Sequence, residues 1–342
     1  MAAGKGERMN PLTLEIPKAL VYVAGKTLLE WSLERLFLSG CNDIIVATGW
    51  KSELIKDALD AIKMPSVEKT SGSVSIIEVP EYERGPLQTF VTATGMVHGS
   101  TNILNPVDLI ISMNDVKAII SAHPKHDQYA VTLAIDYDSN RGSEVSLGSD
   151  GQILAINQEI RKGSKKAKSA LLLTFSSGVI ELCKNELDRG ESRIFPVLNN
   201  MIQVRDHKVH GYSVTGIWYD VDTIHDVLSA NKHLLGSVIK QKPDSVYIPD
   251  GDTMQIEDFL SLDSGIRIGR GVLLKGPCLI EKNSSIGDKC IIGPYVSMAE
   301  DTIIGDNSEV QNTVIFGSSN VPINSRIDGT IIYQSNYYRE EA

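Results

Sequence analysis

A six-residue repeat near the end of the chain restricts the possible fold more than any other feature of the sequence. An apolar residue returns at every sixth position, and a small or β-branched residue stands four positions after each of the first eight. The apolar positions are Ile268, Leu274, Ile280, Ile286, Ile292, Met298, Ile304, Val310 and Phe316. A repeat of this length is typical of a β-helix, in which each copy supplies one short strand and one corner. We therefore predict a β-helix in this part of the chain.

The cysteines fit this interpretation. Cys278 and Cys290 occupy small positions of the repeat, where they would fill tight corners as small apolar side chains. Cys41 and Cys183 lie far from them, and the sequence contains no C-x-x-C pair. Neither a zinc site nor a disulfide framework is indicated.

Length and charge narrow the class of protein. With 342 residues we expect two domains. No apolar run approaches the length that spans a bilayer, and the start is charged where a signal peptide would be apolar, so we expect a cytoplasmic protein. The formal net charge of −10 has the wrong sign for a dedicated nucleic-acid binder, although local positive charge could still bind a nucleotide.

The opening stretch MAAGKGERMNPLTLEIPKAL combines closely spaced glycines with basic side chains. Gly4 and Gly6 would let a backbone loop present its N–H groups to a polyphosphate without side-chain obstruction. Arg8 and Lys18 would supply positive charge. Two glycines this close usually indicate only a turn, so the loop alone does not establish phosphate binding.

Strand and helix patterns alternate after this loop. Apolar runs at 43–49, 73–79 and 129–135 indicate strands, residues 52–62 indicate a helix, and Gly40 is a suitable end for another helix. Strands that alternate with helices argue for a parallel, doubly wound sheet. In such sheets ligands bind at the carboxyl ends of the strands, where the opening loop would lie.

Two segments carry a family resemblance. The opening stretch resembles the signature A-A-G-x-G-x-R-M/L-x-P-L-T…P-K-x-L of the sugar-1-phosphate nucleotidyltransferases, and GYSVTGIWYDVDTIHD resembles that family's closing G-x-W-x-D-x-G-T-x-x-D segment. The resemblance, which extends to glucose-1-phosphate thymidylyltransferase-like proteins, implies an α/β fold. Its parts would be a doubly wound, Rossmann-like nucleotidyltransferase domain with a mixed sheet (1–238), a linker (239–262) and a left-handed β-helix of hexapeptide repeats (263–342).

The family reaction joins a nucleoside triphosphate to a sugar 1-phosphate and releases pyrophosphate. The resemblance implies nucleotide binding by Ala3, Gly4, Gly6 and Gly85, catalytic roles for Arg8 and Lys18, and a Mg²⁺ site formed by Asp108 and Asp220. Asp108 would end a strand over 101–111. Asp115 is a rival carboxylate, which we interpret as part of a helix's first turn, where negative charge is favourable. Gly85 would equally suit the start of a helix without any binding role.

Other positions would face the sugar phosphate. The resemblance implies roles for Ser143, Glu159, Arg161 and Gly178, although the basic run at 161–166 also has the composition of a solvated loop. The chain departs from the family pattern at Pro80, Val107, Ser143, Ile160 and Asp222. These departures support an alternative, a non-catalytic regulatory or binding relative of such an enzyme. They also place an additional carboxylate, that of Asp222, near the expected metal.

The family's glycine loop follows a buried first strand, an apolar run such as Lys-Ala-Val-Ile-Leu. Here Met1 comes directly before Ala2. Without that strand, backbone groups of both neighbours would stay unpaired in the middle of the sheet. We therefore expect that translation begins upstream of this sequence.

The predicted β-helix resembles that of the hexapeptide-repeat acyltransferases. Those enzymes use a histidine at a position that Ile323 occupies here, and no histidine follows His233, so a general base is absent and acyl transfer is disfavoured. We expect the β-helix to serve structure or homo-oligomer formation, because its last coil would leave an open edge. For the reaction we expect thymidylyl or uridylyl transfer to glucose 1-phosphate ahead of guanylyl transfer to mannose 1-phosphate.

Overall fold

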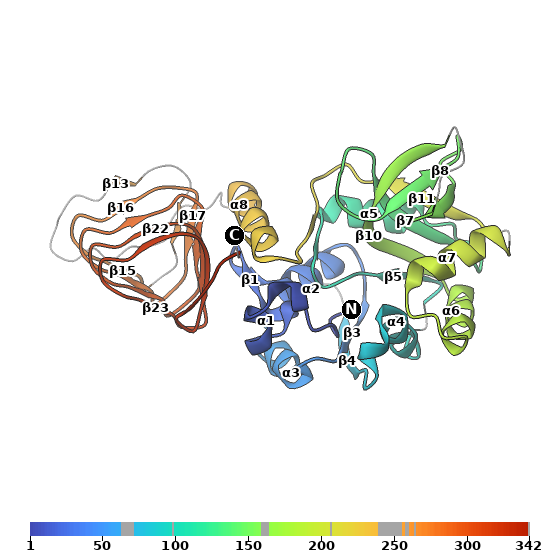
Figure 1. The fold of residues 1–342 in the computed structure, drawn as a ribbon, viewed down its shortest axis with the longest axis horizontal. Helices are drawn as coiled ribbons and strands as arrows, with labels where there is room; N and C mark the ends of the chain where they lie inside the picture. The colour runs from blue at the N-terminus through green and yellow to red at the C-terminus, as the bar shows by residue number, and fades with distance from the viewer. Residues whose placement is uncertain are drawn as a thin grey trace. The chain divides into compact units, whose positions relative to one another are not determined.

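The computed structural model describes residues 1–62, 72–97, 99–158, 164–205, 207–238, 255–256, 260–262 and 265–340 (Figure 1). The chain forms two compact units that are interleaved along the sequence. The first contains residues 1–5, 17–19 and 29–220, and the second contains residues 6–16, 20–28 and 221–342. No helix among the described residues is long and apolar enough to cross a membrane.

The first unit has the expected α/β fold. Its helices are α2 (Leu28–Leu38), α3 (Ser52–Ala61), α4 (Pro86–Thr94), α5 (Met113–Ala122), α6 (Gly178–Asp188) and α7 (Ile194–Gln203). Its strands are β3 (Asp43–Thr48), β4 (Ser73–Glu78), β5 (Thr101–Leu104), β6 (Leu109–Ile110), β7 (Val131–Asp136), β8 (Glu144–Leu147), β9 (Ile153–Ile156), β10 (Lys165–Ser176), β11 (Val209–Ser213) and β12 (Tyr219–Asp220). The predicted strands at 43–49, 73–79 and 129–135 are confirmed to within two residues at each end.

The main sheet is mixed, as expected. Its order is β11-β7-β10-β8-β9, with β5 also paired to β10. Strands β7 and β11 are parallel, whereas β10 runs antiparallel to β5, β7 and β8. The core packs this sheet against α4, α6 and α7, with Phe90 of α4 edge-on to Phe175 of β10. Five of the six residues of β7 are buried, which explains why this strand is an almost continuous apolar run.

The prediction of a single strand over 101–111 is wrong. The chain leaves β5 after Leu104, passes through Asn105 and Pro106, and forms the separate short strand β6. Proline has no backbone N–H to donate to a sheet, which explains the break. Asp108 consequently lies just before β6 rather than at the end of a long strand.

A cavity of about 870 Å³ lies between β3 and β5. Side chains of α2, β3, α4 and β5 line it together with Met1 and Ala2. Among the described residues, β3 pairs along its length with β4 alone, and β5 pairs with β10 alone. Residues 1–3 lie at the end of the cavity like the last residues of a parallel strand. Ala2 N donates to Ala47 O on one side, and Met1 N donates to Asn105 O on the other, both at 2.8 Å.

We expect an apolar segment such as Lys-Ala-Val-Ile-Leu, fused ahead of Met1, to enter this cavity and raise the free energy of unfolding by about 2–5 kcal/mol, since each buried aliphatic side chain contributes about 1.5–3 kcal/mol before its ordering cost. The Met1 α-amino group provides a second readout, because burial lowers its pKa to about 6. Between pH 6 and pH 8 the unfolded chain then binds the proton that the folded chain does not. The stability of the 342-residue chain therefore rises more steeply across this range than that of the fused chain, in which the lowered pKa of the buried His123 still gives a rise near pH 6–7.

Chemical denaturation of the two chains at pH 6, 7 and 8 measures both effects. A fusion of five Gly and Ser residues is the matched control, since it removes the same charge without supplying apolar side chains. Equal stability of the apolar and the Gly-Ser fusions would show that the cavity does not accept a strand.

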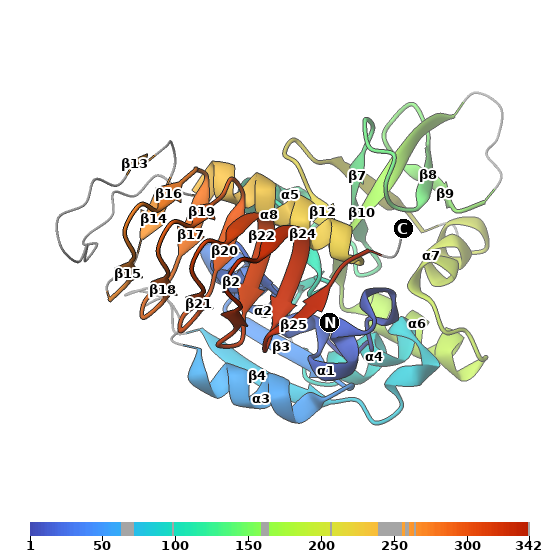
Figure 2. The same ribbon diagram turned by 60° about the vertical axis from the view of Figure 1, so that its left-hand side comes forward.

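The second unit combines short N-terminal elements with the predicted β-helix. It contains α1 (Leu12–Glu15), β1 (Tyr22–Val23), β2 (Lys26–Thr27) and α8 (Ile224–Val238). The β-helix strands are β13 (Gln255–Ile256), β14 (Leu260–Leu262), β15 (Arg267–Ile268), β16 (Leu273–Leu274), β17 (Cys278–Ile280), β18 (Ser285–Ile286), β19 (Ile291–Ile292), β20 (Val296–Met298), β21 (Ile303–Ile304), β22 (Glu309–Phe316), β23 (Asn320–Val321), β24 (Arg326–Tyr333) and β25 (Asn336–Tyr338). Figure 2 shows these strands stacked coil on coil with α8 alongside.

Each early coil spans 18 residues, which is three copies of the repeat: Leu273 pairs with Ile291, which pairs with Glu309. The apolar positions from Ile268 to Val310 are at most 3% exposed, so each of them lies in the interior. The prediction that Phe316 occupies the last interior position is wrong. Met298 pairs with Ile315, not Phe316, because the coils from this point on are one residue shorter. Phe316 instead stacks on Tyr22 of β1, with ring centroids 6.0 Å apart.

A buried asparagine links the elements of this unit. The buried Asn231 of α8 accepts hydrogen bonds from Ala24 N and Ser297 Oγ and donates to Tyr295 O, which ties α8 to the β-helix and to the segment around β1.

The open edge expected at the last coil is partly covered, because β25 pairs antiparallel with β24 over residues 331–333. The chain itself thus supplies part of the edge protection that we had expected from a second copy.

Candidate active site

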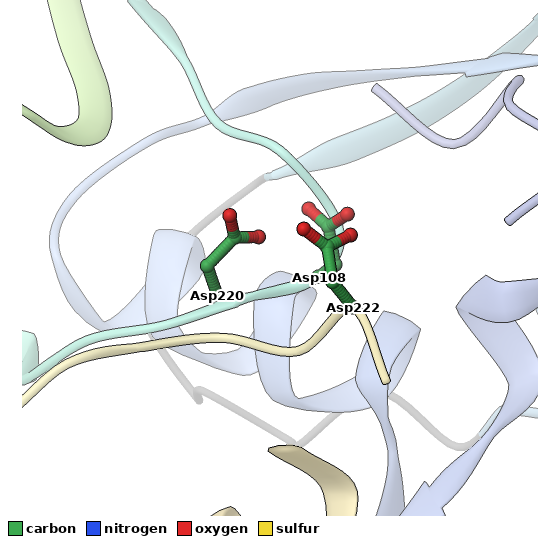
Figure 3. Close-up of side chains that lie close together, drawn as sticks. All are labelled: Asp108, Asp220 and Asp222. Atoms are coloured by element: carbon green, nitrogen blue, oxygen red, sulfur yellow. The ribbon is translucent and has the colours of Figure 1, made fainter. Parts of the chain in front are cut away.

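Two short strands bring the predicted metal ligands together. Strands β6 and β12 pair antiparallel, with Asp220 opposite Leu109, so Asp108 lies next to Asp220 although the two are far apart in sequence. Asp222 follows two residues later in the chain. One carboxylate oxygen from each of Asp108, Asp220 and Asp222 lies within 4.8 Å of the others (Figure 3).

The chemistry of this carboxylate group suits a hard divalent cation. Carboxylate oxygens are the ligands that Mg²⁺ and Ca²⁺ prefer, whereas a structural zinc site would use sulfur or imidazole. All three aspartates are partly exposed, which leaves room for water or phosphate oxygens among the ligands of an ion that usually keeps several non-protein ligands. The residues present therefore fit the Mg²⁺ that the sequence analysis expects.

Both basic residues singled out in the sequence form ion pairs with these carboxylates. Lys18 Nζ lies 2.5 Å from Asp108 Oδ2, and the Lys18 side chain is only 9% exposed. Within the second unit, Arg8 Nη2 lies 2.5 Å from Asp222 Oδ2. The Arg8 side chain is 71% exposed and can exchange this partner for a ligand oxygen. Positive charge thus lies directly beside the carboxylate group.

The glycines of the opening loop differ in their surroundings. Gly6 has a left-handed backbone, with φ of 67°, which favours glycine without any ligand. Gly4 is different, since a Cβ at this position would meet nothing within 4 Å. Ala3 ends the strand-like start of the chain, where its carbonyl accepts a hydrogen bond from Trp50 N at 3.0 Å. Space is therefore open beside the backbone at Gly4, as binding of a polyphosphate there requires.

Gly85 has a structural reason to be glycine. Its φ is 110°, and a Cβ would lie 2.7 Å from the Ser192 carbonyl oxygen. Helix α4 begins at the next residue, Pro86, so the helix start considered in the sequence analysis is confirmed. A role for Gly85 in reading the nucleobase stays a prediction.

Two of the four predicted sugar-phosphate residues, Ser143 and Gly178, lie in different segments of the described structure. Ser143 Oγ accepts a hydrogen bond from Asn157 Nδ2 at 2.9 Å, beside the β8–β9 hairpin. Gly178 begins α6, where a Cβ would lie 2.5 Å from the Gln128 carbonyl oxygen. Glu159 and Arg161 lie outside the described residues. The roles of all four stay predictions.

Asp115 does not belong to the carboxylate group. It is 1% exposed and lies in the first turn of α5, where its backbone N–H donates to Ser112 Oγ at 3.0 Å, as expected. Its carboxylate accepts from Thr215 N at 2.8 Å and from Gly216 N at 3.0 Å. Burial opposes ionisation of Asp115, but these hydrogen bonds and those of the Ser112 and Thr215 hydroxyls outweigh it and keep the pKa below its ordinary value. No sequence pattern predicts that this carboxylate holds a distant loop.

Comparison with known proteins finds two matching family models and several similar relatives. Residues 1–237 match the family described as nucleotidyl transferase, and residues 253–339 match the GMPPB C-terminal domain. The chain is 25% identical over 352 residues to the bifunctional protein GlmU of Methanocaldococcus jannaschii, covering 97% of this chain and 76% of that protein. It is 24% identical over 354 residues to the mannose-1-phosphate guanyltransferase of Gibberella zeae, covering 94% of each.

A solved structure shares the fold. A UDP-glucose pyrophosphorylase complexed with UDP-glucose aligns with a TM-score of 0.55 and 18% identity. The alignment covers 69% of this chain and 97% of that one.

Proposed function

This chain belongs to the nucleotidyl transferase family, and we propose that it is a Mg²⁺-dependent enzyme that transfers a nucleotidyl group from a nucleoside triphosphate to a sugar 1-phosphate. The observation that carries the proposal is the pairing of β6 with β12, which gathers Asp108 and Asp220 beside the buried Lys18. Carboxylates that can hold a divalent cation, next to a lysine, are what a reaction between two phosphate groups needs.

In the proposed step a phosphate oxygen of the sugar 1-phosphate attacks the α-phosphorus of the nucleoside triphosphate. The bond from the α-phosphorus to the oxygen that bridges it to the β-phosphorus breaks, and pyrophosphate leaves with the electron pair. No proton has to move, because the attacking oxygen is already anionic. Catalysis then consists of positioning and charge neutralisation.

The chain's own residues would divide this work. Asp108 and Asp220 would hold Mg²⁺, with Asp222 as a further acceptor. When bound, the ion would offset phosphate charge and polarise the α-phosphate. Lys18 would bind the phosphate region, and the exposed Arg8 would stabilise charge that develops on pyrophosphate. Backbone N–H groups near Gly4 would orient the triphosphate.

The proposed substrate pair rests on the relatives rather than on the site. The match of residues 253–339 to the GMPPB C-terminal domain, and the guanyltransferase that aligns over 94% of both chains, favour GTP with mannose 1-phosphate. We rank this pair ahead of the thymidylyl or uridylyl transfer to glucose 1-phosphate that the sequence analysis favoured. UTP with N-acetylglucosamine 1-phosphate is a further pair to test.

A pyrophosphate-release assay with Mg²⁺ tests the proposal. The four nucleoside triphosphates, GTP, UTP, dTTP and ATP, are each combined with mannose, glucose and N-acetylglucosamine 1-phosphates, on the chain as it stands and on the fusion with an apolar N-terminal segment. Turnover with one pair establishes the activity and names the substrates. Folded protein that binds nucleotide and turns over no pair, in either form, would replace the proposal with the non-catalytic regulatory relative.

We expect Gly4→Ala to raise the KM for the triphosphate by about tenfold and to leave the melting temperature unchanged. The protein itself leaves open space for the added methyl group, so only a bound ligand would meet it. Gly85→Ala is the contrasting variant. Its Cβ would press on the Ser192 carbonyl, so the melting temperature should fall. A Gly4→Ala enzyme with unchanged KM would remove the opening loop from the nucleotide site.

The β-helix and the assembly form a separate part of the proposal. We keep the predicted homo-oligomer and cytoplasmic location as proposals, although β25 already covers part of the edge that first suggested assembly. Size-exclusion chromatography with light scattering measures the mass in solution. A mass of one chain across micromolar concentrations would reject the oligomer.

A further inference from the structure

Strands β6 and β12, which carry the metal ligands, are too short to fix each other. Each has two residues, and the pairing comprises only Tyr219 opposite Ile110 and Asp220 opposite Leu109. An isolated two-stranded ladder of ordinary length is already marginal in water. The separation of Asp108 and Asp220 must therefore be held by other contacts.

Arg35 of α2 supplies one of these contacts. It is 8% exposed, and its guanidinium donates from Nη2 to Leu109 O at 2.6 Å and from Nη1 to Ile111 O at 3.1 Å. These carbonyls flank Ile110, so one side chain holds β6 at two points. Burial lowers the pKa of Arg35 to about 10, which still leaves the side chain charged at neutral pH. Its buried Nε has no hydrogen-bond partner among the described residues, so the arrangement carries a cost.

Asp115 of α5 supplies the other contact. Its carboxylate accepts from the backbone N–H groups of Thr215 and Gly216, which lie four to five residues before Asp220 in the connection from β11 to β12. Further donors are the hydroxyl of Ser112 at 2.6 Å, that of Thr215 at 3.0 Å and that of Tyr212 at 3.3 Å. A Cβ on Gly216 would lie 3.0 Å from Asp115 Oδ2, so the loop approaches the carboxylate closely.

We infer that Arg35 and Asp115 are positioning residues that hold the backbones of β6 and β12 so that Asp108 and Asp220 stay at metal-binding separation. We call this pair the brace. Arg35 donates hydrogen bonds to backbone carbonyls on the Asp108 side, and Asp115 accepts hydrogen bonds from backbone N–H groups on the Asp220 side. Neither belongs to the carboxylate group itself. The inference rests on the proposed function, because it assigns the brace a purpose only if the two aspartates bind metal.

Binding of Mn²⁺ alone, followed by electron paramagnetic resonance, tests the brace without requiring turnover. In Asp115→Asn the new amide presents N–H donors where two backbone N–H groups need acceptors. In Arg35→Lys the charge stays, but an ammonium cannot span both carbonyls as the planar fork does. Each variant should raise the Kd for Mn²⁺ about tenfold. Thr215→Val removes only one hydroxyl donor and should raise the Kd for Mn²⁺ two- to threefold. This milder variant provides a readout if Asp115→Asn or Arg35→Lys fails to fold.

Asn199→Ala is the matched control. Asn199 is also buried and also holds backbone, donating to Ile156 O at 2.8 Å and accepting from Ile156 N at 2.9 Å, but it serves the strand β9. It should lower the melting temperature and leave Mn²⁺ affinity unchanged. Affinity that is unchanged in the folded brace variants, or lost equally in Asn199→Ala, would overturn the brace and leave the proposed function standing. Absence of Mn²⁺ binding in the unmodified protein would overturn both.

Discussion

Asp220→Asn is expected to lower the turnover of nucleotide-sugar synthesis by about a thousandfold or more, while the protein stays folded. Asparagine keeps the shape of the side chain but not the negative charge that a hard divalent cation requires, and loss of one preorganised electrostatic contact at a reacting phosphate costs about 10²–10³ in rate even without a metal. Asp220 is partly exposed, so its neutralisation leaves no buried charge behind.

Steady-state pyrophosphate release at saturating substrates and several Mg²⁺ concentrations measures this effect. Removal of the metal with EDTA should reproduce it in the unmodified enzyme, and added Mg²⁺ should restore only that enzyme. Asp188→Asn, at the exposed end of α6, is the control for loss of one negative charge in the same unit. Activity of Asp220→Asn within tenfold of the unmodified enzyme would show that β12 carries no metal ligand.

The β-helix was predictable because its signal is repeated. Each copy places one apolar residue in the interior of the β-helix, so chance matches at single positions cannot imitate the period. The prediction went wrong at Phe316, because the coil between Met298 and β22 is one residue shorter and Ile315 takes the interior position. The coil is shorter because β22 continues across a position where the repeat would place a corner. The six-residue spacing alone does not predict this continuation.

The candidate site was predictable only as far as motifs extend. Lys18 and Asp220 lie in the two segments with family signatures, Asp108 was assigned to the metal by the looser part of the resemblance, and the structure brings these three together. The brace could not be predicted, because Arg35 and Asp115 bind backbone groups of residues 74 to 101 positions away. Backbone carbonyls and N–H groups are the same in every residue type, so the sequence around them carries no sign of such contacts.

Lys18→Gln is the second change with a large expected effect, lowering kcat/KM by about a hundredfold or more. Lys18 lies 2.5 Å from Asp108 and is nearly buried, so a contribution to the fold accompanies its proposed role at the phosphate site. Removal of one partner of a buried ion pair is strongly destabilising, by about 3–5 kcal/mol when both are fully buried. The Asp108 side chain is 21% exposed, so solvent should reduce the cost here to about 1–3 kcal/mol.

The double variant Lys18→Gln with Asp108→Asn separates the two roles of this pair. Two neutral side chains of similar shape can hydrogen-bond to each other, so we expect the double variant to regain most of the stability that Lys18→Gln loses. Activity should not return, because both the phosphate-binding charge and a metal ligand are gone. Urea denaturation and pyrophosphate release on the unmodified chain, the two single variants and the double variant give both quantities. If activity recovered together with stability, Lys18 would act on the fold alone and its catalytic role would have to be abandoned.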